Sequence, residues 1–191
     1  PVKTKNIMLD VIIALIPSLA ASIYFFGPRA AVITIVSVAT CVIAEYICRK
    51  VMKREQTIGD LSAVVTGILL AFNLPSSVPI YVPIIGGLVA IVMVKQMFGG
   101  LGQNFVNPAL LARIILMNSF PVLMTTWYPA GSFGADTTAT ASPLANIAAG
   151  SVDALPSYMD MFIGNIPGCL GETSALALLI GGIYLIARKV I

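Results

Sequence analysis

The sequence predicts an all-α, polytopic membrane protein. Hydrophobic residues make up 58% of its 191 residues and charged residues only 10%, whereas about a quarter of the residues of a soluble domain are charged. The apolar residues are gathered into long runs that helix-ending and helix-starting motifs separate. We therefore expect about six transmembrane or half-spanning helices, since a helix needs about 20 apolar residues to cross a bilayer.

The expected helices occupy residues 11–26, 30–47, 61–74, 78–94, 108–127 and 173–187. The third stretch is short for a hydrocarbon core of about 30 Å, and it ends in Asn73-Leu74-Pro75, which is typical of a helix stop. Backbone groups at such a break must bond to protein or water, because lipid offers them no partner. A short, broken segment of this kind commonly marks a binding site.

The basic residues predict the orientation of the chain in the membrane. Nine of the 11 Lys and Arg residues fall on one side of these segments, Arg29 lies alone on the other side, and Arg113 lies inside the fifth segment. The nine are Lys3, Lys5, Arg49, Lys50, Lys53, Arg54, Lys95, Arg188 and Lys189. Short cytoplasmic loops are rich in Lys and Arg, so the N-terminus is expected to be cytoplasmic.

This orientation gives a single membrane domain. It has five segments in residues 1–127, an extracytoplasmic loop at 128–172 and a sixth helix in 173–191. The first apolar stretch is not followed by an A-x-A site, so we expect no cleavable signal peptide.

The absence of His excludes several kinds of chemistry. Haem on a His ligand, zinc sites that contain His, and Ser-His or Cys-His hydrolase machinery all need an imidazole. Cys41, Cys48 and Cys169 are too few and too scattered for an iron–sulfur cluster within the chain. Cys41 and Cys48 are also about 10.5 Å apart along a helix, too far for a disulfide. We expect buried, apolar cysteines and no metal site.

The first motif starts at Asp60, which can cap a helix N-terminus and stabilise the helix dipole. Ser62, Ala63, Thr66 and Gly67 then form a small, partly hydroxylated face at helical spacing. This face fits close helix packing. It also fits the wall of a pocket for a planar ligand.

The second motif is the glycine-rich stretch before the fifth segment. Asn107 followed by Pro108 is a favourable helix start. Asn104 and the preceding glycines can form a loop at membrane depth whose amides face a ligand, or a plain tight turn. The stretch does not match the dinucleotide pattern G-x-G-x-x-G, because Phe105 occupies the last position.

The third motif lies in the expected external loop, where four hydroxyl residues and two alanines are interleaved after Asp136. By composition alone, such a Thr/Ala stretch is typical of a flexible loop. Its hydroxyls are also accessible oxygen nucleophiles, because alanines on either side leave them unobstructed.

Taken together, the motifs resemble the D subunit of the Rnf complex, and the related B subunit of the sodium-pumping NADH:quinone reductase shares much of the pattern. In family order they are D-x-S-A-x-x-T-G-x-L-L-A, K-x-x-F-G-G-x-G-x-N-x-x-N-P-A, D-T-T-A-T-A-S-P-L-A and G-E-T-S-A-L. The resemblance covers nearly the whole chain. It implies that this chain is one part of a fold of roughly ten helices, of the inverted-repeat kind that broken membrane helices often build.

The resemblance also implies a function. The chain would be the flavin-carrying electron-transfer subunit of an ion-translocating ferredoxin:NAD oxidoreductase in the cell inner membrane, coupled to Na⁺ or H⁺ transport. NAD and ferredoxin would bind to other subunits, so no complete active site is expected in this chain. The implied partners are the A, B, C, E and G subunits and a flavin transferase, with no nucleic acid. Arg113 would be an internal charge partner, since an intramembrane cation is costly unless it is used.

In this family, FMN is joined through its phosphate to a Ser or Thr hydroxyl of the external loop. Aligning Pro143-Leu144 with the family pattern places the acceptor at Ser142, although Thr is usual there and Gly or Ser is usual at Thr140. Reading residues 137–140 as the core of the motif would instead choose Thr140. We prefer Ser142, and we expect Asp136 to orient the loop.

The expected flavin-binding residues are Ser142, Thr140, Asp136, Pro143, Thr66, Asn104 and Asn107. The resemblance leaves open a second, noncovalent flavin such as riboflavin.

Two other functions fit the same residues. Broken helices and small-residue packing also serve the solute path of a transporter or channel. A scaffold subunit that has lost its flavin would differ only in leaving Ser142 and Thr140 unmodified. A covalent flavin separates these functions, because it keeps the denatured polypeptide fluorescent on a gel.

Overall fold

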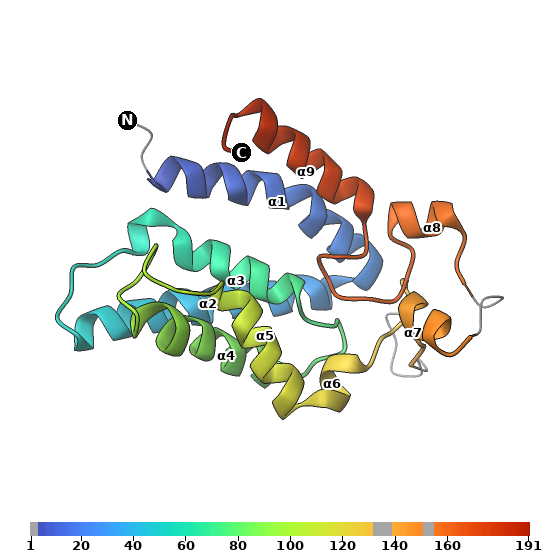
Figure 1. Ribbon diagram of the computed structural model, residues 1–191, viewed down its shortest axis with the longest axis horizontal. Coiled ribbons are helices and arrows are strands. Elements are labelled where there is room, and N and C mark those ends of the chain that lie inside the picture. Colours follow the sequence, from blue (N-terminus) through green and yellow to red (C-terminus); the bar gives the residue numbers. More distant parts are fainter. Residues whose placement is uncertain (1–3, 132–138, 151–154) are drawn as a thin grey trace.

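The computed structural model describes residues 4–131, 139–150 and 155–191, and all regular elements within these ranges are helices (Figure 1). The longer helices are α1 (Thr4–Phe26), α2 (Pro28–Val51), α3 (Ser62–Phe72), α4 (Tyr81–Leu88), α5 (Pro108–Ser119) and α9 (Ala175–Ala187). The short ones are η1 (Ile58–Asp60), α6 (Pro121–Thr125), α7 (Pro143–Ala148) and α8 (Tyr158–Ile163). The expected all-α fold is confirmed. A π-helical turn, η2 (Val89–Gln96), continues α4 directly.

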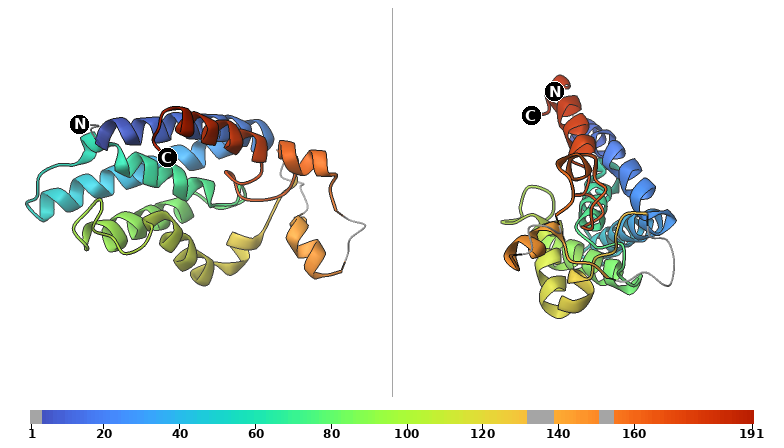
Figure 2. Two further views of the ribbon diagram at one scale, coloured as in Figure 1. Left: turned by 45° about the horizontal axis from the view of Figure 1, so that its top comes forward. Right: turned by 90° about the vertical axis from the view of Figure 1, so that its right-hand side faces the viewer.

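The first two helices form an antiparallel pair. α1 and α2 have 23 and 24 residues and are long and apolar enough to cross a membrane. Gly27 joins them with a φ of 72°, a value that favours glycine, and Pro28 begins α2. The other apolar helices, 62–72, 81–96, 108–119 and 175–187, are shorter. α3 and α4 pack against α2, α9 packs against α1, and α5 packs against α3, α4 and η2. α7 and α8 lie at one end of this bundle (Figure 2).

The small face of α3 packs against α2. A Cβ atom on Gly67 would lie 2.6 Å from the Cα atom of Val38, so only glycine allows this approach. The Ser37 hydroxyl of α2 donates to the Gly67 carbonyl at 2.8 Å. The expectation of close helix packing at this face is confirmed.

The backbone at the end of α3, where the helix is interrupted, is hydrogen-bonded to a segment far along the sequence. Leu170 N donates to Leu74 O and Gly171 N to Phe72 O, each at 3.0 Å. The Ser18 hydroxyl of α1 donates to Gly171 O at 3.1 Å. Protein groups therefore bond the backbone at the break, as expected from the scarcity of partners in lipid.

The segment expected as one helix at 108–127 is two helices, and this expectation was wrong. Phe120 leaves the helical region, with φ −132° and ψ 57°, and Pro121 then starts α6. The helix start at Asn107 is confirmed, because its Oδ1 accepts hydrogen bonds from Ala109 N at 2.9 Å and Leu110 N at 3.4 Å.

Asp60 caps α3 in a different way from the expected one. The N-cap position belongs to Leu61, which has a φ of 65°. The Asp60 carboxylate accepts from both the backbone N and the hydroxyl of Ser62, at 2.8 Å and 2.5 Å. Its charge therefore still lies at the start of the helix, where the dipole favours it.

α9 returns along α1, and the contact gives a matched test of packing. A Cβ atom on Gly181 would overlap with the Ala14 carbonyl oxygen, whereas nothing lies within 4 Å of one on Gly182. We expect Gly181→Ala to lower the stability by about 1–3 kcal/mol, as overpacking does. Gly182→Ala should be neutral or stabilising by up to about 1 kcal/mol. Thermal unfolding in detergent measures both, and equal effects would contradict this packing.

Candidate functional site

The two expected acceptor hydroxyls lie beside the start of α7. Thr140 is exposed, and its backbone N donates to the Trp127 carbonyl at 2.9 Å. Ser142 is partly buried and is the N-cap of α7, with its Oγ accepting from Ala145 N at 3.2 Å. Pro143 follows at the first helical position, which suits its fixed φ. The structure thus brings Thr140, Ser142 and Pro143 together.

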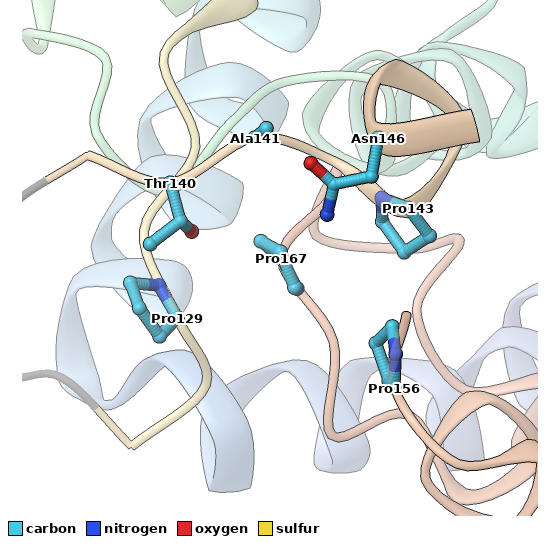
Figure 3. A pocket seen from close by; sticks show the side chains of 7 residues that line it. All are labelled: Pro129, Thr140, Ala141, Pro143, Asn146, Pro156 and Pro167. Carbon is cyan, nitrogen blue, oxygen red and sulfur yellow. The ribbon is translucent and has the colours of Figure 1, made fainter. Parts of the chain in front are cut away.

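A pocket of about 310 Å³ opens next to these residues (Figure 3). Its described lining is Pro129, Thr140, Ala141, Pro143, Asn146, Pro156 and Pro167. The Thr140 hydroxyl belongs to this lining, whereas the Ser142 hydroxyl is engaged at the helix start. Thr140 therefore lines the pocket, and Ser142 lies in the chain between two lining residues, Ala141 and Pro143.

The chemistry of the pocket wall suits an aromatic ring system. Four of its described lining residues are prolines, which give rigid apolar surfaces without backbone N–H donors. Thr140 and Asn146 add a hydroxyl and an amide, and none of these lining side chains is charged. The volume is at the small end of the range of about 300–1,000 Å³ for ligand pockets. Asp136 lies outside the described residues, so its expected role stays a prediction.

The loop that contains Asn104 lies at the opposite end of α2, whereas Thr66, next to Gly67, lies beside the middle of α2. A Cβ atom on Gly100 would lie 2.5 Å from Nη2 of Arg49, which places the loop before α5 beside the last turn of α2. The Thr140 region lies beside the first turn of α2, since Gly131 N donates to Phe25 O at 2.7 Å. A helix of 24 residues is about 36 Å long, so one flavin cannot contact both ends.

Within that loop, one side chain has an unused polar atom. Oδ1 of Asn104 is buried and has no hydrogen-bond partner among the described residues. A buried carbonyl oxygen without a hydrogen-bond partner costs free energy, so this atom could accept a hydrogen bond from a ligand. Asn107 is exposed and caps α5, and the Thr66 hydroxyl donates to Ser62 O at 2.8 Å. The roles of Asn107 and Thr66 as flavin contacts stay predictions.

A buried ion pair, which sequence reasoning missed, joins α2 to η2. Lys95 Nζ lies 2.9 Å from Oε2 of Glu45, with exposed side-chain fractions of 2% and 0%. Gln96 and Thr57 donate to Oε1 of the same carboxylate at 3.0 Å and 2.7 Å. Lys95 also donates to the Ser62 hydroxyl at 2.6 Å. Both Lys95 and Gln96 belong to the π-helix η2, and π-helical segments are frequent at functional sites.

Lys95 was counted among the cytoplasmic basic residues, and the structure adds that its charge is buried and paired with Glu45. The signal that could have found the pair is the carboxylate of Glu45 within an apolar stretch, because an intramembrane charge needs a partner. Arg113 was expected to be an internal charge partner, and its Nη1 donates to Oδ1 of Asn73 at 2.8 Å. This partner is an amide at the break after α3 rather than an acid.

The fold and the family of the chain together describe a polytopic α-helical membrane protein with interrupted helices and a proline-lined pocket in its 128–172 region. The chain belongs to the NQR2, RnfD, RnfE family, whose profile matches residues 1–191. This membership confirms the resemblance that the sequence motifs indicate.

Three relatives show the similarity in detail. The D subunit of the Na⁺-translocating ferredoxin:NAD⁺ oxidoreductase complex of Acetobacterium woodii is 48% identical over 98% of this chain and 59% of the relative. The D subunit of the proton-translocating complex of Clostridium ljungdahlii is 39% identical, with the same coverage of both chains. The D subunit of an ion-translocating oxidoreductase complex of Halorhodospira halophila is 36% identical over 100% of this chain and 62% of the relative. The chain thus spans about three fifths of the length of these relatives.

The buried ion pair generates a stability prediction. We expect Glu45→Met or Lys95→Met alone to lower the free energy of unfolding by about 3–5 kcal/mol, because each leaves one buried charge without its partner. The double variant should lose less than either single variant, since no unpaired charge remains. Unfolding of the wild type, both single variants and the double variant in detergent measures this double-mutant cycle. Strictly additive losses of stability would contradict a direct interaction.

Proposed function

We propose that this chain is the flavin-carrying electron-transfer part of a membrane-bound, ion-translocating ferredoxin:NAD oxidoreductase of the Rnf type. The observation that carries the proposal is the proline-lined pocket, which is lined by the candidate acceptor Thr140 and by both chain neighbours of the other candidate, Ser142. Family membership and the functions for which the relatives are named support the same proposal. The flavin supplies electron transfer when it is bound, and the protein binds, orients and shields it.

The proposed cofactor is FMN, held by a phosphoester to Ser142 or, alternatively, to Thr140. Ser142 remains the preferred acceptor because Pro143-Leu144 aligns with the family motif. Pro143 also limits the backbone beside it. The position of Thr140 in the pocket wall supports the alternative. Thr140, Asn146 and the proline side chains would then surround the ring and exclude water from it.

A second, noncovalent flavin is proposed at the loop that contains Asn104. The buried Oδ1 of Asn104 would accept a hydrogen bond from the flavin, and Asn107 and Thr66 are further candidate contacts. This position is separate from the covalent one, because the two lie at opposite ends of α2. Denaturation releases a noncovalent flavin such as riboflavin and leaves the covalent FMN on the chain.

The coupling of electron flow to ion movement is proposed to involve Glu45 and Lys95. Ionisable groups within membrane helices are functional candidates by default, since their burial is costly. Glu45 accepts from three different side chains, so this carboxylate links α2 to η2 and to the segment before η1. The relatives are named for sodium in one case and for protons in another, and this chain is proposed to use one of the two.

The proposed location is the cell inner membrane, with a cytoplasmic N-terminus and an extracytoplasmic flavin loop. Without the buried Lys95, eight of the nine basic residues on the cytoplasmic side still support this orientation. Arg29, alone on the other side, bonds to backbone carbonyls. The proposed partners are the A, B, C, E and G subunits of the complex and a flavin transferase that modifies the loop.

A small-solute transporter is the alternative in another class, because the interrupted α3 also suits a solute path. Fluorescence of a covalently bound flavin on a denaturing gel distinguishes the two functions. It also excludes a scaffold subunit without flavin.

The acceptor is tested by substitutions that separate attachment from helix capping. Ser142→Ala should abolish gel fluorescence and lower the mass of the chain by one FMN adduct, while Ser142→Thr should keep both because the hydroxyl persists. Ser157→Ala is the matched control, since Ser157 caps the six-residue α8 in the same way, with its Oγ accepting from Asp160 N at 3.1 Å. Each cap loss costs about 1 kcal/mol, and only Ser142→Ala should remove the flavin.

The outcome for Thr140 decides between the two acceptors. If Thr140→Val loses the flavin and Ser142→Ala keeps it, the acceptor is Thr140. A chain that keeps no covalent flavin even in the wild-type complex contradicts the proposed function itself.

The orientation is tested by labelling an introduced cysteine. Ala149 is exposed and has a φ of −82°, so Ala149→Cys is compatible with the backbone. With the three native cysteines replaced by Ala, we expect an impermeant thiol reagent to label whole cells. Labelling only after the membrane is opened would reverse the proposed topology.

A further inference from the structure

We propose that Arg29 is a positioning residue for the flavin-bearing loop. It fixes residues 76–78, and these residues in turn fix the segment to which the loop is bonded. The consequence for the flavin rests on the proposed function, whereas the mechanical link rests only on the hydrogen bonds of the described residues.

The first link runs from α2 to the loop after α3. The Arg29 Nε donates to Ser76 O at 2.9 Å, and Nη2 donates to Ser77 O at 3.3 Å and Val78 O at 3.1 Å. A planar guanidinium offers several donors in a fixed arrangement, which a Lys ammonium cannot reproduce. Among the described residues, no carboxylate forms a salt bridge with Arg29. Its side chain is therefore used to hold backbone carbonyls.

The second link runs from that loop to the base of the flavin loop. The Ser77 hydroxyl donates to Thr126 O at 2.8 Å. The next residue, Trp127, accepts from Thr140 N at 2.9 Å through its own carbonyl. A chain of hydrogen bonds therefore leads from Arg29 to Thr140, two residues before Ser142.

The arrangement of the helices agrees with this path. Figure 1 draws the α1–α2 turn, the loop after α3 and the segment after α6 at the same end of the molecule. The last turn of α1 adds a second anchor, because Phe25 O accepts from Gly131 N at 2.7 Å. Residues 126–131 are therefore bonded to the α1–α2 turn in two ways, directly at Gly131 and through Ser77 at Thr126.

A simpler role for Arg29 makes a different prediction. If it only closed the break after α3, its loss would loosen residues 76–78 and nothing beyond them. A positioning role requires that loosening also appears in residues 126–131 and 139–148, which Arg29 does not contact through any of its three hydrogen bonds.

Hydrogen exchange of the purified complex, read by mass spectrometry, tests this difference. We expect Arg29→Gln and Arg29→Lys to speed exchange in residues 126–131 and 139–148 by about fivefold or more, the effect of losing one net hydrogen bond. Residues 158–163 should be unchanged. Ser77→Ala should have the same effect without disturbing Arg29, and Ser77→Thr should restore protection.

Thr126→Val is the matched control. The Thr126 hydroxyl donates to Val122 O at 2.6 Å, within its own turn, and the Thr126 carbonyl that binds Ser77 remains in the variant. We expect no change in residues 139–148. Faster exchange confined to 76–78 in Arg29→Gln, or unchanged exchange of 139–148 in Ser77→Ala, overturns the inference.

The flavin provides a second readout. In Arg29→Gln and Ser77→Ala, we expect a lower flavinylated fraction and a shifted midpoint potential of the FMN that is attached, while Thr126→Val matches the wild type. If the wild-type protein carries no covalent flavin, the proposed function is contradicted, but the hydrogen-exchange result still tests the role of Arg29. If hydrogen exchange of residues 139–148 is unchanged in Arg29→Gln and Ser77→Ala, the inference about Arg29 is wrong, even if the wild type carries FMN.

Discussion

The structure depends on one constraint, namely that lipid cannot bond a peptide group. α3 ends after 11 residues, so the carbonyls at its end need partners from the protein. Leu170 and Gly171 supply backbone donors from the distant 164–174 segment, and Arg29 supplies donors to the loop that follows. The break therefore connects α1, α2 and the segment before α9. The pocket at the α7 end is built on residues that these contacts hold in place.

The features that the sequence predicts well are local. The helix start at Asn107 and the stop after Phe72 depend on residues within about one turn, and both are found. The partner of Glu45 lies 50 residues away, so no local pattern indicates it, and Lys95 resembles a loop residue in the sequence. The motif around Ser142 predicts a flavin attachment site, and residues of this motif line a pocket in the structure. Its pocket could not be predicted, because Pro129, Pro156 and Pro167 reach it only through the tertiary fold.

The buried ion pair has a second physical role beside its place in the proposed ion coupling. Apolar helix faces can pack in more than one register, since hydrophobic contacts are not directional. Glu45 is bonded to side chains of η2 and of the segment before η1, and Lys95 reaches Ser62 of α3. These directional bonds are satisfied in one register only. The pair therefore specifies how α2, α3 and η2 meet, even where an apolar replacement would be as stable.

The pairing of the α3 end with residues 170 and 171 also has a consequence for biogenesis. The Ser18 hydroxyl is separated from its acceptor by 153 positions in sequence. A ribosome makes about 5–20 residues per second, so the first three helices wait many seconds beside the translocon before their partner segment exists. During that time the open carbonyls at the break must be hydrated or covered by the insertion machinery. The hydrogen bonds that link α1 to the end of α3 through Gly171 form only after this later segment has been made.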